Sequence, residues 1–130
     1  MPLRILLVDD NRRFLEAVRR FLARESLEVV GHALSGAAAL EQVAALQPDL
    51  VLMDMAMPHM DGLEAAWRIK ATPNPPRIIM LTLHDNPAYA AKAKAMGADG
   101  FISKSEFGSQ LIPLIQLLFG TQVLEPESVP

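Results

Sequence analysis

The sequence contains no cysteine, few aromatic residues and no apolar run long enough to cross a membrane. Without cysteine, the chain forms neither disulfides nor thiolate metal sites. Aromatic residues make up 5% and hydrophobic residues 51% of the sequence, so Leu, Val, Ile, Ala and Met must fill the core. The net charge of -3 argues against direct binding of nucleic acid or an anionic membrane. No targeting segment is visible, and we expect a cytoplasmic location.

The chain has room for one domain, built from alternating strands and helices. A chain of 130 residues can bury most of its unfolded surface in a single core. Short apolar runs, typical of strands, alternate with segments of helical periodicity. This alternation predicts an α/β fold, a doubly wound parallel sheet of five strands with helices on both faces. The predicted strands span residues 5–8, 27–33, 50–54, 77–82 and 100–103.

The third predicted strand ends in an acidic residue. The apolar run Leu50–Met53 leads directly into Asp54, and a loop rich in proline, glycine and aspartate follows. Asp54 is therefore predicted at the carboxyl end of a buried strand, at the edge where open α/β sheets bind ligands. The alternative is that Asp54 only caps the next helix.

Polar residues also end three of the other predicted strands. Asp9 and Asp10 follow the first strand, Thr82 ends the fourth, and Lys104 follows the fifth. Because all parallel strands end at one edge of the sheet, these four residues should converge with Asp54. Their convergence favours a functional site over a simple helix cap.

This set of side chains predicts phosphoryl chemistry. Three crowded carboxylates repel one another unless one of them takes up a proton or a cation binds between them. Because the available ligands are all oxygens, Mg²⁺ is the predicted ion. Lys104 and Thr82 would stabilise charge on phosphoryl oxygens. A carboxylate can form an acyl phosphate, and the central Asp54 is the predicted nucleophile.

Apolar periodicity predicts the buried faces of the helices. For the first helix the buried stripe contains Phe14, Val18, Phe21 and Leu22. For the third helix, from about residue 63 to 71, the predicted common side contains Leu63, Ala66, Trp67 and Lys70. Either Asp10 or Asn11 can cap the first helix, and Asn86-Pro87 begins a fourth helix that ends at Gly97.

The last helix contains a proline and is apolar around nearly its whole circumference. Pro113 would cost about 3 kcal/mol in a helix interior, so we expect the regular helix to begin late, near Ser109. A helix that is apolar on all sides favours a second neighbour. The segment after Gly120, with two prolines and two acids, is interpreted as a tail or linker.

Four motifs, which follow one another in the same order as in a known protein family, are the basis of a family resemblance. They are Leu7-Val8-Asp9-Asp10, Asp54-x-x-Met57-Pro58-x-Met60-Asp61-Gly62, Leu81-Thr82 and Gly97-Ala98-x-Gly100-Phe101-x-x-Lys104. With these motifs the chain resembles the receiver domain of bacterial two-component response regulators. The resemblance implies a flavodoxin-like sheet with strand order 2-1-3-4-5. It also implies a receiver domain over residues 1–119, followed by a tail or the start of an interdomain linker over residues 120–130.

The resemblance implies a role for each site residue. Asp54 would accept phosphate from a histidine kinase or a phosphotransfer protein. Asp10 and Asp54 would bind Mg²⁺ directly, Asp9 largely through water, and the Ala56 carbonyl would complete the metal site. Lys104 and Thr82 would hold the phosphoryl oxygens.

The resemblance also implies how phosphorylation is read out. Thr82 would move toward the phosphate and Phe101 would rotate inward. This would change the surface formed by the fourth helix, the predicted strand 100–103 and the last helix, and would make a homodimer possible there. The alternative for Phe101 is a plain core residue. Ala56 and His84 would tune dephosphorylation, whereas His84 is otherwise a surface loop residue.

Departures from the common receiver pattern narrow the subfamily. Ser105 stands where many receivers have a proline after the lysine, so we expect a trans peptide bond there. The stretch 82–87 resembles receivers that carry a helix-turn-helix domain of the nitrate-response and quorum-sensing type, and 123–127 resembles their linker. We therefore expect the regulatory part of a DNA-binding transcription regulator that contacts DNA only through an output domain absent from this chain. A stand-alone receiver, acting as a phosphorelay or protein-interaction switch, is the alternative.

Other features carry weaker hypotheses. The outward side of the first helix, with Arg12, Arg13, Leu15 and Arg19, is a candidate kinase-docking face, although a solvated arginine-rich face explains the charges equally well. His32 and His59 are interpreted as structural or exposed, without an identifiable partner.

Two further functions compete with the switch. A Mg²⁺-dependent phosphohydrolase of the haloacid dehalogenase type usually has its nucleophile and acid two residues apart after the first strand, and here Asp9 and Asp10 are adjacent. The other competing function is a protein-interaction module that works without phosphorylation, as in pseudo-receivers. Pseudo-receivers typically lack one of the acids or the lysine, and this sequence has all five site residues. We expect a signalling switch that promotes its own phosphorylation and dephosphorylation, and not an enzyme.

Overall fold

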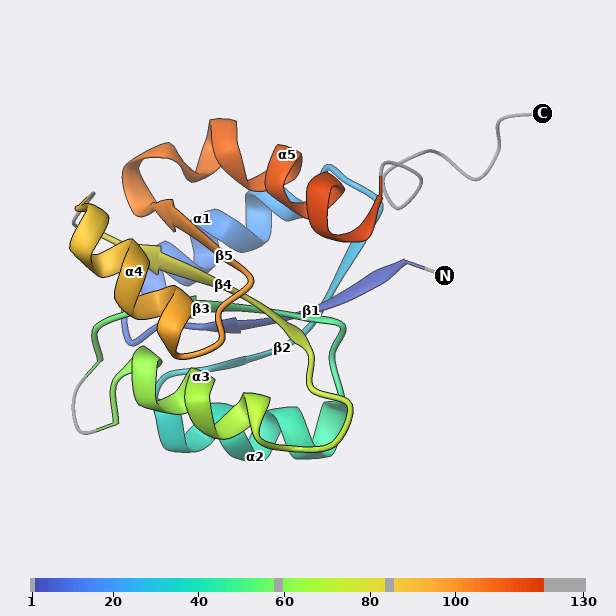
Figure 1. Ribbon diagram of the computed structural model, residues 1–130. Coiled ribbons are helices and arrows are strands. Elements are labelled where there is room, and N and C mark those ends of the chain that lie inside the picture. Colours follow the sequence, from blue (N-terminus) through green and yellow to red (C-terminus); the bar gives the residue numbers. More distant parts are fainter. Residues whose placement is uncertain (1, 58–59, 84–85, 121–130) are drawn as a thin grey trace.

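The structure, a computed structural model, describes residues 2–57, 60–83 and 86–120, which form a five-stranded sheet covered by helices on both faces (Figure 1). All paired strands are parallel, and the strand order is β2-β1-β3-β4-β5. The strands are β1 (Leu3–Val8), β2 (Leu27–Ala33), β3 (Leu50–Asp54), β4 (Arg77–Thr82) and β5 (Gly100–Ser103). The predicted fold class and strand order are confirmed.

In the described part of the chain, five α-helices enclose the sheet. Two of them, α1 (Arg12–Leu22) and α5 (Phe107–Phe119), cover one face, and α2 (Gly36–Leu46), α3 (Gly62–Lys70) and α4 (Pro87–Ala95) cover the other. None of the helices in the described ranges combines the length and apolar character needed to cross a membrane.

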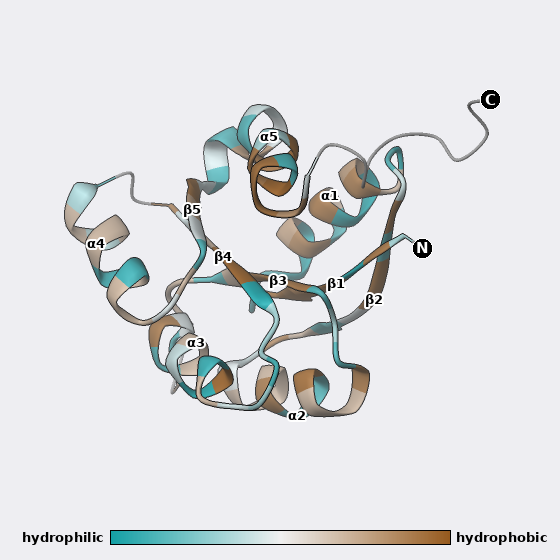
Figure 2. Cartoon of the chain, turned by 45° about the vertical axis from the view of Figure 1, so that its right-hand side comes forward, coloured by the Kyte–Doolittle hydropathy of each residue, from teal (hydrophilic) through white to brown (hydrophobic). Residues whose placement is uncertain are grey.

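Two hydrophobic cores lie between the sheet and its helix layers. Along β3, Val51 and Met53 face the core under α2, α3 and α4, whereas Leu50 and Leu52 face the core under α1 and α5. Because both faces are covered, the central strands are apolar at successive positions instead of alternating with polar residues. Figure 2 shows these hydrophobic strands between the helices.

Polar side chains mark the helix starts. The Asn11 side chain accepts hydrogen bonds from two backbone N–H groups in the first turn of α1, so Asn11 and not Asp10 is the cap. Asp61 caps α3. As predicted, Asn86 caps α4, with Pro87 in its first turn. Helix α4 ends at Ala95, slightly earlier than predicted.

The predicted buried face of α3 is wrong by about one residue. Trp67 is 60% exposed, and the buried residues are Gly62, Ala65, Ala66 and Ile69. The reason is the close approach of Gly62 to the end of β3, where an added Cβ would lie 2.0 Å from the Asp54 carbonyl oxygen. This contact fixes the rotation of α3 and turns its small residues toward the sheet.

On α1, the predicted outward position of Leu15 is also wrong. Leu15 is buried in the same core as Val18 and Leu22, whereas Phe14 and Phe21 are only half-buried. The exposed side of α1 therefore contains Arg12 and Arg13 without Leu15.

Helix α5 begins earlier than predicted. It starts at Phe107, directly after a 3-10 turn over Lys104–Glu106, and Pro113 lies inside it. Phe107 packs edge-to-face against the rings of Phe14 and Phe21, with centroid distances of 5.5 and 5.4 Å, and this tertiary contact holds the first turn. Pro113 is exposed, so water can solvate the carbonyl that loses its helical partner.

Asp99, a half-buried residue just before β5, joins three segments at the edge of the sheet opposite Asp54. Asp99 accepts hydrogen bonds from Arg77 Nη1 (3.1 Å) and the Ile78 N–H (2.8 Å) and forms an ion pair with Lys70 Nζ (2.7 Å). Burial raises the pKa of Asp99, but the bonds from Lys70, Ile78 and Arg77 outweigh this effect and hold the pKa below its usual value.

The close approach of Gly62 to the Asp54 carbonyl predicts that a larger residue at position 62 destabilises the fold. Gly62→Ala should lower the free energy of unfolding by roughly 2–4 kcal/mol, because the new methyl group meets backbone atoms that cannot move aside. Urea denaturation measures this effect. Gly108→Ala is the matched control, because nothing lies within 4 Å of its added Cβ in α5, and it should be neutral or stabilising. Equal effects of the two substitutions would contradict the account.

Candidate functional site

Three carboxylates meet at the carboxyl edge of the sheet. Asp54 is the last residue of β3, and Asp9 and Asp10 directly follow β1, its neighbour in the sheet. Each offers an oxygen, and these oxygens all lie within 4.8 Å of one another. Asp9 and Asp54 are buried, whereas Asp10 is exposed. The cluster therefore has two enclosed acids and one that faces solvent.

One buried ammonium group lies between the two enclosed acids. Lys104 Nζ is 2.6 Å from Asp9 Oδ2 and 3.3 Å from Asp54 Oδ1, and its side chain is only 9% exposed. The 3-10 turn after β5 brings Lys104 to this position. Asp9 Oδ1 accepts a hydrogen bond from the Asn11 N–H (2.9 Å), which orients the carboxylate. Among the described residues, Asp9 Oδ2 accepts no well-formed hydrogen bond in spite of its contact with Lys104.

The backbone after β3 shapes the Asp54 side of the site. The Ala56 N–H donates a hydrogen bond to Asp54 Oδ1 (3.4 Å). The Met55 N–H bonds to the Leu81 carbonyl (2.9 Å), which continues the pairing of β3 with β4 to the edge. Thr82 is buried and follows Leu81, the register partner of Asp54. The Thr82 hydroxyl side chain therefore belongs to the same edge as the acids.

Burial makes Asp54 a weaker acid than an ordinary aspartate. Burial raises the pKa of Asp54 to about 6, and the negative charge of Asp9 adds to this effect. The ammonium of Lys104 and the Ala56 N–H lower the pKa but do not cancel the increase. At neutral pH the Asp54 carboxylate is therefore still ionised, but its charged form is less stable in this site than it would be in water.

The charges at this site fit a divalent cation. Three carboxylates and one ammonium group leave two uncompensated negative charges when all are ionised. Among the described residues, the ligand atoms of this cluster are carboxylate oxygens, which hard cations such as Mg²⁺ prefer. The exposed position of Asp10 leaves the cluster open to solvent on one side.

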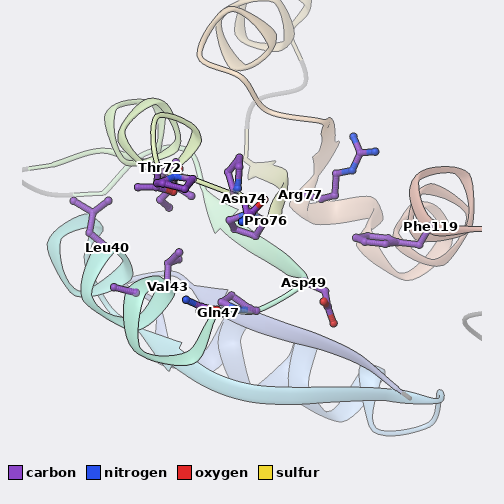
Figure 3. A pocket seen from close by; sticks show the side chains of 14 residues that line it. Leu40, Val43, Gln47, Asp49, Thr72, Asn74, Pro76, Arg77 and Phe119 are labelled. Atoms are coloured by element: carbon purple, nitrogen blue, oxygen red, sulfur yellow. Dashed lines mark hydrogen bonds between the residues drawn. The ribbon is translucent and has the colours of Figure 1, made fainter.

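A separate pocket of about 680 Å³ lies away from this cluster (Figure 3). Residues of α2, the loop before β4 and the end of α5 line it, among them Val43, Pro76, Arg77 and Phe119. It contains none of the predicted site residues. The chemistry of the edge, and not the volume of this pocket, therefore identifies the candidate site.

The structure confirms some of the remaining predictions about individual residues and contradicts others. Phe101 lies in β5, half-buried against the core under α4. His32 is exposed, but its Nδ1 lies 3.5 Å from Arg19 Nη2, so the prediction that it has no partner is wrong. The described peptide bonds are all trans, including the one between Lys104 and Ser105, as predicted. His59 and His84 lie outside the described residues.

Phe14 lies at the site beside Lys104, a position that the sequence pattern did not predict. The Phe14 ring centroid lies 4.6 Å from Lys104 Nζ, although the apolar stripe predicted only a core position for Phe14. A helical stripe carries no sign that a ring faces a charged group on another element, because that contact depends on the tertiary fold.

A family model for the response regulator receiver domain matches residues 5–116. The chain belongs to this receiver family. Receiver domains of response regulators are signalling switches. Together with the motifs at the sheet edge, this match confirms the resemblance found in the sequence.

Relatives narrow the subfamily of this receiver. A transcriptional regulatory protein NarL from Mycobacterium tuberculosis is 36% identical over 97% of this chain, and the response regulator VraR from Staphylococcus saprophyticus is 34% identical over 98%. The matches cover 59% and 62% of these relatives, so this chain spans about three fifths of their length. These relatives confirm the predicted likeness to the nitrate-response class.

Solved structures also match this chain, and two of them are response regulators of the NarL and LuxR type. The signal receiver domain of NarL from Mycobacterium tuberculosis matches with a TM-score of 0.78 and 37% identity, over 86% of this chain and 94% of that one. A LuxR-family response regulator from Aurantimonas matches with a TM-score of 0.85 and 33% identity, over 91% and 85% of the two chains.

The raised pKa of Asp54 predicts that the wild type and the Asp54→Asn variant differ in stability by an amount that depends on pH. As pH rises from about 4 through 6, the folded receiver still holds the Asp54 proton that the unfolded chain has lost, so the free energy of unfolding falls. Without divalent cations, Asp54→Asn should therefore be more stable than the wild type by about 1–3 kcal/mol at pH 7.5. This advantage should disappear toward pH 4.

Urea denaturation across this pH range, in the presence of a chelator, measures the difference. Glu41→Gln on the exposed surface of α2 is the control for loss of one carboxylate, and its effect should be small at every pH. An Asp54→Asn variant no more stable than the wild type at pH 7.5 would show that the buried charge carries no penalty.

Proposed function

We propose that this receiver is a phosphorylation-dependent switch in which Asp54 accepts a phosphoryl group from a histidine kinase or a phosphotransfer protein. The observation that carries the proposal is the buried Asp54 carboxylate, which shares the Lys104 ammonium with Asp9 at the edge of the sheet. A nucleophile, a cation for phosphoryl oxygens and a set of metal ligands are thereby gathered within one small site.

Mg²⁺ is the proposed cofactor. Asp10 and Asp54 would bind it directly, Asp9 largely through water, and the Ala56 carbonyl would supply a further oxygen. When bound, the ion neutralises the excess negative charge and draws the phosphoryl donor to the carboxylates. The two uncompensated charges of the cluster support this assignment.

Each protein group has a proposed part in the transfer. The ionised Asp54 carboxylate attacks phosphorus, an O–P bond forms, and the bond from phosphorus to the donor breaks. The pKa of about 6 leaves most Asp54 ionised at pH 7.5, so the nucleophile is available. Lys104 then pairs with a phosphoryl oxygen, and the Thr82 hydroxyl donates to another. Ala56 and His84, the latter outside the described residues, would tune hydrolysis of the acyl phosphate.

The proposed readout is a rearrangement beside β5. Thr82 would move toward the phosphate and Phe101 would rotate inward. A cavity of about 320 Å³ supports this movement, because Phe101 lines it together with Ala90, Ala93 and Ala98, which are small. The altered surface of α4, β5 and α5 is the proposed homodimer contact.

We propose that residues 1–119 are the receiver domain and residues 120–130 a tail or the start of an interdomain linker. The matches cover only 59% and 53% of two relatives named as transcriptional regulators, which supports a role as the regulatory part of a DNA-binding transcription regulator. DNA contact would then come only from an output domain outside this sequence. A stand-alone receiver in a phosphorelay is the alternative.

Incubation with acetyl phosphate and Mg²⁺, followed by intact-mass measurement, tests the proposal. The wild type should gain one phosphoryl group, and Asp54→Asn or removal of Mg²⁺ should abolish the gain. Lys104→Met should slow the reaction roughly 10- to 100-fold, because a charge partner of the transferred group is lost. Lys92→Met, which removes an exposed lysine from α4, should change the rate less than twofold.

Two results would contradict the proposal. An Asp54→Asn variant that is phosphorylated like the wild type would remove Asp54 as the acceptor. Continuous release of phosphate from simple phosphate esters, without accumulation of the phosphorylated protein, would instead favour the phosphohydrolase.

A further inference from the structure

Phe14 places the face of an aromatic ring against the lysine of the acidic site. Its ring centroid lies 4.6 Å from Lys104 Nζ, within the range of a cation–π contact. Phe14 belongs to the first turn of α1, whereas Lys104 follows β5, so the contact joins segments that are far apart in the sequence.

The burial of Lys104 makes this contact stronger than a surface pair. Its side chain is only 9% exposed, and cation–π attraction increases when the cation loses water. A second pair gives the contrast, because Lys92 Nζ lies 5.6 Å from the Tyr89 centroid and Lys92 is exposed. Of these two pairs, only the one at the site combines a short distance with a desolvated cation.

Three groups confine the ammonium of Lys104. Asp9 and Asp54 attract it at 2.6 and 3.3 Å, and the Phe14 ring adds an attraction that involves no competing negative charge. A lysine side chain has several rotatable bonds, so a fixed position costs conformational entropy. The ring contact with Nζ therefore reduces the remaining freedom of Lys104.

Other aromatic rings hold Phe14 in its orientation. Phe107 meets Phe14 edge-to-face at 5.5 Å with an interplanar angle of 78°. Phe21 meets the same Phe107 ring at 5.4 Å and 83°. The three rings connect α1 to α5, and they fix the Phe14 face before any ligand enters the site.

We propose that Phe14 is a positioning residue that pre-organises Lys104 for the phosphoryl group. This inference rests on the proposed function, since it assigns Lys104 to phosphoryl oxygens. It also differs from a purely structural role. A core residue needs only apolar volume, whereas a positioning ring needs electron density on its face.

A series of phenylalanine analogues at position 14, with one, two or three ring fluorines, tests the inference. Fluorine withdraws electron density from the ring face and leaves the shape nearly unchanged, so every member should fold. Binding of beryllofluoride, a phosphoryl mimic, in the presence of Mg²⁺ is measured for each protein. The dissociation constant should rise stepwise, by roughly 3- to 30-fold over the series. Mg²⁺ binding alone should change less than twofold, because the carboxylates are unaltered.

The same series at Phe21 is the matched control, because Phe21 contacts Phe107 but makes no cation–π contact with Lys104. Its beryllofluoride affinity should stay within twofold. A second readout is the NMR shift of the Lys104 ε-methylene protons, which the Phe14 ring should move upfield in the wild type and which Phe14→Leu should restore.

The outcomes separate this inference from the proposed function. A flat beryllofluoride affinity along the position-14 series would overturn the positioning role and leave Asp54 as the acceptor. An unshifted Lys104 methylene signal in the wild type would overturn the ring contact itself. A wild type that cannot bind beryllofluoride, while the upfield shift is present, would overturn the proposed function and with it the positioning role.

Discussion

The crowding of three carboxylates around a single buried ammonium group is the interaction on which the rest of the site depends. Asp9 and Asp54 share Lys104, and Asp10 adds a third negative charge at the solvent side. This arrangement is unfavourable in isolation, as the pKa of about 6 at Asp54 indicates. A divalent cation bound among these carboxylates would relieve this repulsion.

The fold meets this requirement by holding the backbone rigidly around the acids. Parallel pairing of β3 with β1 and β4 brings the strand ends to one edge. Gly62 then lets α3 approach the Asp54 carbonyl more closely than any other residue could. On the opposite face of the sheet, Phe14, Phe107 and Phe21 connect α1 to α5 beside Lys104. These contacts hold the strand ends and the two helix layers together around the charged residues.

Local patterns predicted the strands and the site edge, because continuous apolar runs and the polar residues that end them are visible in the sequence. The rotation of α3 depended on close packing, which periodicity does not record: Gly62 must touch β3, so Trp67 turns outward. Leu15 instead has the helical spacing of Val18 and Leu22, with which it is buried. Likewise, Pro113 predicted a late start of α5, but the helix begins at Phe107, whose edge-to-face contact with Phe14 joins distant segments and is not visible in the sequence. The ion pairs of Asp99 and the ring over Lys104 join distant segments, and no local signal indicates them.

We propose that Asp54, and neither of its acidic neighbours, carries the phosphoryl group. Reductive trapping tests it most directly, because borohydride converts an aspartyl phosphate to homoserine, which fragmentation of the peptides locates by mass. After treatment with acetyl phosphate and Mg²⁺, we expect homoserine at position 54 alone. Homoserine at position 9 or 10, or its absence from a protein that has gained phosphate, would contradict the account.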